Sequence, residues 1–99
     1  MLTFIRSMSA APGKFVQLAA FADEVDPVVS RVLGKKIKHG MMVGGQAGRM
    51  AWIIEYNSMA HLEEMTGKLL ADPDYLALLQ KGEGLSVAGS MHDDLVLFR

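Results

Sequence analysis

The chain contains no cysteine in its 99 residues, and this absence excludes several kinds of chemistry at once. Disulfide bonds, thiolate zinc sites and cysteine nucleophiles all require a residue that is missing. Small secreted domains commonly depend on disulfides, so the lack of cysteine favours a cytoplasmic protein.

Long apolar runs are also absent. No stretch approaches the roughly 18 apolar residues of a transmembrane helix. Residues 1–6, Met-Leu-Thr-Phe-Ile-Arg, lack the basic and apolar regions of a secretory signal. We therefore expect no membrane as a partner.

Charge of one sign is not gathered anywhere into a long run. Ten basic and eleven acidic residues give a formal net charge of −1. Lys35, Lys36 and Lys38 form the densest basic group, and a solvated helix end explains it. Nucleic acid is not expected as a partner, because phosphate contacts need clustered cations.

Motifs for metal ions, nucleotides and hydrolysis are missing as well. The three histidines, His39, His61 and His92, show no tight metal-ligand spacing, and residues 92–94 alternate between the two faces of a strand. Residues 44–48 are glycine-rich but lack the spacing of a nucleotide-binding loop, which predicts a hairpin turn. No serine lies in a GxSxG elbow. We expect no metal and no other cofactor.

The sequence is instead rich in apolar residues. Hydrophobic residues make up 51% of the chain and charged residues 21%, and the mean hydropathy is +0.22. One domain over residues 1–99 has room for a single core. The apolar excess predicts an additional buried surface, in an interface or in a ligand cavity.

Periodicity predicts strands and helices in alternating order. Alternating residues predict strands, and apolar residues at three- and four-residue spacing predict helices. Asp26–Pro27 interrupts the first helical pattern, so the helix either continues past this point or restarts there. Asn57 or Ser58 caps the second helix. The expected strands are residues 2–9, 37–44, 49–57 and 85–99, the last bent around 89–94. The first expected helix ends at Gly34 and the second at Leu70. A short third helix begins at Asp72–Pro73 and ends before Gly82.

This order predicts an α+β fold of the split β-α-β type. Two helices would cover one face of a four-stranded antiparallel sheet and leave the other face bare. Ile5, Met42, Ile53 and Val96 cannot all face water, so a second copy packed face to face is the expected partner.

Three short segments carry a resemblance to a known group of proteins. They are Trp-Ile-Ile-Glu-Tyr-Asn-Ser at 52–58, Ala-Asp-Pro-Asp-Tyr at 71–75 and Leu-Val-Leu-Phe-Arg at 95–99. With the element order, they make the chain similar to the dimeric α/β-barrel superfamily, which is ferredoxin-like, and to its antibiotic-biosynthesis-monooxygenase-like and NIPSNAP-like members. The resemblance implies a homodimer with a cavity between each sheet and its own helices. Haem chemistry is disfavoured, because Arg6 stands where that branch has asparagine and Trp52 belongs to a strand.

Arg6 is the first candidate binding residue. It shares a strand face with apolar neighbours, where a guanidinium needs a partner. A ligand carboxylate or phenolate would serve. A structural ion pair with Glu55 is the alternative.

The other candidates are aromatic residues and one histidine. Trp52 and Tyr56 share a strand face and Tyr75 lies on the short helix, so they suit a flat ligand, although they also suit an ordinary core. His39 is a candidate general base or ligand contact if it faces inward, and a surface histidine otherwise.

These observations predict a homodimeric protein that binds a small apolar or aromatic, acidic ligand through Arg6, His39, Trp52, Tyr56 and Tyr75. One alternative is a cofactor-independent monooxygenase or isomerase acting on a polyketide-like or phenolic substrate, with His39 or Tyr56 assisting proton transfer. Another is a structural dimer without a ligand. A one-residue slip in strand register would exchange the two faces and move the site.

Overall fold

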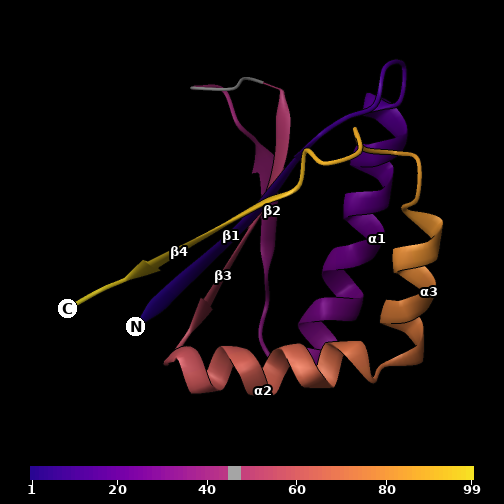
Figure 1. Cartoon of the computed structure of the whole chain (residues 1–99). Helices are drawn as coiled ribbons and strands as arrows, with labels where there is room; N and C mark the ends of the chain where they lie inside the picture. The colour runs from indigo at the N-terminus through magenta and orange to yellow at the C-terminus, as the bar shows by residue number, and fades with distance from the viewer. Residues whose placement is uncertain (45–47) are drawn as a thin grey trace.

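The computed structural model describes residues 1–44 and 48–99. Its elements follow the expected order (Figure 1): β1 Leu2–Ser9, α1 Phe15–Leu33, β2 Lys38–Met41, β3 Arg49–Tyr56, α2 Met59–Leu70, α3 Pro73–Lys81 and β4 His92–Leu97. The middle of the predicted hairpin turn, residues 45–47, lies outside the described residues. In the described part of the chain, no helix has the length and apolar character needed to cross a membrane.

The four strands form one sheet in the order β2-β3-β1-β4, and all neighbouring strands are antiparallel. This confirms the expected α+β, ferredoxin-like fold. Arg6 lies opposite Trp52, and Leu2 lies opposite Tyr56. Because side chains alternate along a strand, the even-numbered residues of β1 and β3 share one face of the sheet.

The helices begin and end where the sequence indicates. Helix α1 continues through Pro27 and ends at Gly34, whose φ of 71° is the left-handed conformation that glycine adopts readily. Ser58 caps α2 by accepting a hydrogen bond from the His61 N–H, at 3.2 Å. Asp72 caps α3 and also binds Arg31 of α1, at 3.0 Å.

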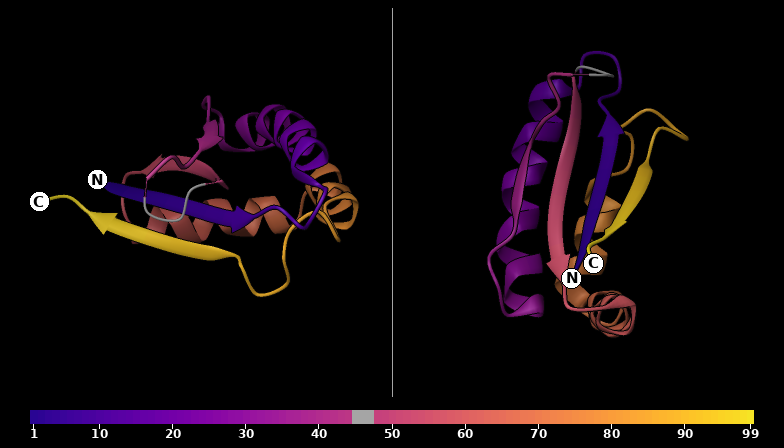
Figure 2. Two further views of the ribbon diagram at one scale, coloured as in Figure 1. Left: turned by 90° about the horizontal axis from the view of Figure 1, so that it is seen from above. Right: turned by 90° about the vertical axis from the view of Figure 1, so that its left-hand side faces the viewer.

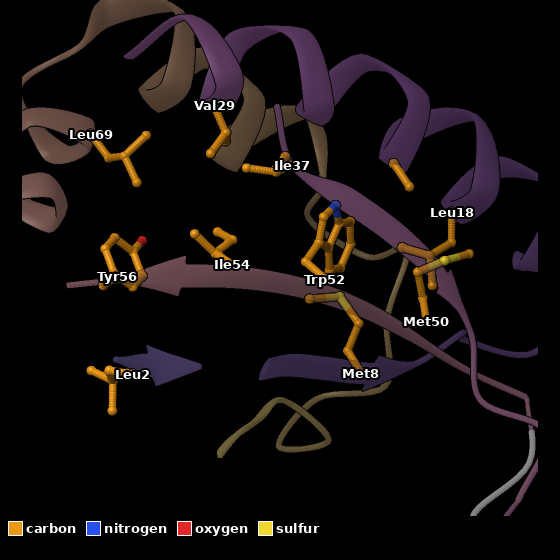
Figure 3. Close-up of a cluster of buried hydrophobic side chains, with 11 residues drawn as sticks. Leu2, Met8, Leu18, Val29, Ile37, Met50, Trp52, Ile54, Tyr56 and Leu69 are labelled. Carbon is orange, nitrogen blue, oxygen red and sulfur yellow. The ribbon is translucent and has the colours of Figure 1, made fainter. Parts of the chain in front are cut away.

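All three helices lie on the same side of the sheet (Figure 2), and the core fills the space between them. Figure 3 shows side chains of β1 and β3 meeting those of the helices. The buried core residues are Leu2, Met8, Leu18, Ala22, Val29, Ile37, Met50, Trp52, Ile54, Tyr56 and Leu69.

The end of the chain differs from the expectation. Strand β4 spans only His92–Leu97, preceded by an isolated bridge between Ala10 and Ser86. Gly84 and Gly89 have φ values of 79° and 77°, so the backbone turns twice before the strand begins. Every residue of β4 is exposed, and the strand pairs with β1 alone at the edge of the sheet.

Candidate functional site

A cavity of about 270 Å³ lies between the sheet and the helices. Ligand sites typically measure roughly 300–1,000 Å³, so this cavity suits a ligand of one or two rings. Its wall is mainly apolar and comes from both layers of the fold. The lining residues are Phe4, Arg6, Met8, Phe21, Val25, Val29, Ile37, Trp52, Ile54, Tyr56, Thr66, Leu69, Leu70, Tyr75, Leu78, Leu79 and Met91.

Four of the five predicted site residues line this cavity. Arg6 projects from β1, Trp52 and Tyr56 from β3, and Tyr75 from α3. The predicted strand register therefore holds, and the face that carries these residues is the one beneath the helices. Their role in binding a ligand stays a prediction.

Arg6 forms a bidentate ion pair with Asp93 of the neighbouring strand β4. Its Nε and Nη2 atoms lie 2.8 and 2.9 Å from the two carboxylate oxygens. The hydrogen bond to Asp93 raises the pKa of Arg6 against the opposing effect of burial. The same hydrogen bond lowers the pKa of Asp93, so the carboxyl group is ionised at neutral pH.

The alternative considered for Arg6, a structural ion pair with Glu55, is wrong in its partner, because the carboxylate that pairs with Arg6 is that of Asp93. Glu55 lies opposite Thr3 in the pairing of β1 with β3. Both residues are odd-numbered, whereas the even-numbered residues of these two strands face the helices. Its carboxylate therefore projects from the other face of the sheet, on the side away from Arg6.

Tyr56 is buried, with 2% of its surface exposed. Burial is the main cause that raises the pKa of its phenol, the nearby Tyr75 adds to this effect, and Arg6 opposes it. Tyr56 is therefore protonated at neutral pH and can donate a hydrogen bond. The ring packs edge-on against Phe4 and His61, with centroids 6.4 and 5.5 Å apart.

Trp52 lines the cavity and lies on β3 between Arg6 on β1 and His39 on β2. Figure 3 shows its indole nitrogen on the side of the sheet where Ile37 lies. The indole N–H is buried and meets no hydrogen-bond acceptor within residues 1–44 and 48–99. The indole thus adds an apolar surface and one unused donor to this part of the fold.

His39 faces the helices but does not line the cavity. Its Nδ1 lies 2.5 Å from the carboxylate of Asp26, and its Nε2 lies 3.4 Å from that of Asp23. Both carboxylates belong to α1. The histidine therefore holds β2 against α1, and both of its ring nitrogens face carboxylates.

Two polar residues that matter for the structure were not anticipated. Asp93 lies on the face that carries Arg6, because the two residues are opposite each other in the pairing of β1 with β4. Arg49 is 7% exposed on the opposite face, where it donates hydrogen bonds to Ser7, Ser9 and the carbonyl of Ser90. A basic residue at a strand end gives no sequence signal of such burial.

Several solved structures resemble this chain over nearly its whole length. A NIPSNAP family protein with unknown function from Agrobacterium tumefaciens has a TM-score of 0.81 at 21% identity, covering 97% of this chain and 86% of its own. A NIPSNAP-like domain protein from Burkholderia xenovorans has a TM-score of 0.79 at 15% identity, covering 99% and 84%. A proposed antibiotic biosynthesis monooxygenase from Deinococcus radiodurans has a TM-score of 0.72 at 12% identity, covering 100% and 93%.

At these identities the structural likeness shows the fold alone. Among curated proteins, none matches the chain. The profile of the NIPSNAP family, in contrast, matches residues 3–98, which is nearly the whole sequence. The resemblance expected from residues 52–58, 71–75 and 95–99 is confirmed, and the chain belongs to the NIPSNAP family.

Proposed function

We propose that the protein is a homodimer that binds a small apolar or aromatic compound between its sheet and its helices. The observation that carries this proposal is the grouping of Arg6, Tyr56 and Tyr75 in the wall of one apolar cavity. Ligand sites combine a mainly apolar wall with a few polar groups that fix the ligand's orientation. An ordinary core would bury these polar side chains less readily.

The cavity favours a flat ligand with a polar group at one end. Trp52, Phe4 and Phe21 offer aromatic surface to a ring system. The phenol of Tyr56 keeps its proton at neutral pH, so it can donate to a hydroxyl or carbonyl oxygen. A compound of one or two rings with such an oxygen meets both requirements.

The second copy would cover the outer face of the sheet, which is the face opposite the helices α1, α2 and α3. Ile53 at 50% and Val96 at 42% are exposed on this face. Packing two such faces together removes this apolar surface from water, and a closed two-fold pair is the commonest way to do so.

An enzymatic role receives less support from the site. The monooxygenase or isomerase that we considered requires His39 or Tyr56 to assist proton transfer. His39 is held by two carboxylates of α1 outside the cavity wall. The raised pKa of Tyr56 keeps its phenol protonated at neutral pH, so it cannot accept a proton as a general base there. We therefore propose binding as the function, and the cavity itself argues against a purely structural dimer.

Filling the cavity tests this proposal. Val25 lines the cavity, whereas Val16 lies on the same helix with 77% of its surface exposed. Titration calorimetry with 2-naphthol should show one molecule bound per chain. Val25→Phe should weaken binding at least about tenfold, which corresponds to roughly 1.4 kcal/mol, because the added ring occupies the ligand's space.

Val16→Phe is the matched control and should bind 2-naphthol as the unchanged protein does. Circular dichroism of each variant establishes that it is folded. A folded Val25→Phe variant with unchanged affinity would place the ligand elsewhere, and the absence of binding to the unchanged protein would contradict the proposal.

A further inference from the structure

We propose that Asp93 makes the cavity select uncharged aromatic ligands over ionised acids. This inference rests on the proposed binding function and specifies the ligand class. It reverses the sequence-based expectation of an acidic ligand, which depended on Arg6 having no carboxylate partner on its own face of the sheet.

The wall of the cavity carries little net charge. Of the lining residues within the described part of the chain, only Arg6 is charged. Both oxygens of Asp93 accept hydrogen bonds from this guanidinium. The two groups lie opposite each other on paired antiparallel strands, so the backbone itself holds them together. The pair therefore brings a cavity with one positive charge close to neutrality.

An ionised ligand would meet an arginine that is already paired. A ligand carboxylate that reaches Arg6 must either displace Asp93 or lie beside it. Displacement forfeits a bidentate interaction, and proximity places two like charges beside each other. The acid also gives up its own hydration on entering an apolar cavity. Each of these effects weakens the binding of an anion.

An uncharged ligand avoids all three costs. The pair with Asp93 engages Nε and Nη2 of Arg6, so the N–H groups of Nη1 lie outside it. Tyr56 and Tyr75 add phenolic hydroxyls to the same wall. A neutral hydroxyl or carbonyl group can accept from these donors while the ion pair stays intact.

The neighbouring Asp94 provides a matched control. It lies opposite Ile5, so its side chain projects from the other face of the sheet. There it lies 3.0 Å from the Nε2 of His92. Asp93→Asn and Asp94→Asn remove the same charge from adjacent positions of one exposed strand, but only the first changes the charge at the cavity.

The test compares 2-naphthol with 2-naphthoate, which share a ring system but differ in charge at neutral pH. Calorimetry should show that the unchanged protein and Asp94→Asn bind naphthol at least about tenfold more tightly than naphthoate. Asp93→Asn should reduce this ratio at least about tenfold, because Arg6 is then free to pair with the acid.

Equal affinity of the unchanged protein for both compounds overturns the inference and leaves the proposed function standing. The ratio for the unchanged protein requires no variant, so this outcome is available even if Asp93→Asn does not fold. A folded Asp93→Asn variant with an unaltered ratio also overturns the inference. If neither compound binds to any of the proteins, the proposed function is contradicted and this inference with it.

Discussion

Arg49 shows how one side chain holds three parts of the fold together. It belongs to β3, and its guanidinium donates to the hydroxyls of Ser7 and Ser9 on β1. It also donates to the carbonyl of Ser90, in the segment that leads to β4. These acceptors are neutral oxygens, so the buried cation depends on hydrogen bonding for its stability.

Replacing Arg49 should therefore destabilise the protein. Arg49→Met keeps the apolar stem but removes every donor, which leaves the half-buried carbonyl of Ser90 without this partner. We expect the free energy of unfolding to fall by about 1–3 kcal/mol, measured by urea denaturation. Arg31→Met removes an exposed arginine and should cause a smaller loss. Equal stability of Arg49→Met and the unchanged protein would show that these hydrogen bonds contribute little.

For single residues, the sequence was sufficient to predict which face of the sheet carries each side chain, but not which residue it pairs with. Strand alternation alone places Arg6, Trp52 and Tyr56 on one side, and the register confirms it. The pairing of Arg6 with Asp93 joins residues 87 positions apart and depends on how β4 aligns with β1. No local pattern encodes that alignment, so Asp93 could not be identified from the sequence.

Gly82 follows the last residue of α3, at a point where this helix lies close to α1. A Cβ atom built on Gly82 would lie 2.7 Å from the end of the Phe21 ring. This distance is far below ordinary carbon contact. Phe21 belongs to α1 and lines the cavity. The absence of a side chain at position 82 thus determines where one wall of the cavity stands.

Two glycine-to-alanine variants separate this effect from helix propensity. Gly82→Ala should displace the Phe21 ring and weaken the binding of 2-naphthol. Gly67→Ala, in α2, meets no atom within 4 Å. It should leave binding unchanged and raise the free energy of unfolding by about 0.5–1 kcal/mol, because alanine favours the helix. Calorimetry and urea denaturation measure the two effects. Unchanged binding in Gly82→Ala would show that Phe21 moves without affecting the ligand.

The elements themselves were mostly predictable. Residues 2–9 form β1 as the alternation predicts, and Asp72–Pro73 opens α3 as expected of a capping residue followed by proline. The last strand was predicted too long, because the apolar residues before it contact the body of the protein without joining the sheet. Leu85, for example, packs against the core from a loop.

At the scale of the whole molecule, the apolar excess of the sequence is divided between two surfaces. One lies beneath the helices and lines the cavity. The other is the outer face of the sheet with the exposed strand β4, where Ile53 and Val96 meet water in the single chain. In the homodimer that we propose, the partner chain covers the second surface, and a bound ligand covers the first.

Native mass spectrometry with added 2-naphthol tests both parts of this account in one measurement. The account predicts a mass of two chains carrying two ligand molecules. Ile53→Glu should shift the population toward single chains, because it places a charge on the outer face, whereas Leu76→Glu on the exposed side of α3 should not. Single chains from the unchanged protein, or a dimer that retains no ligand, would contradict it.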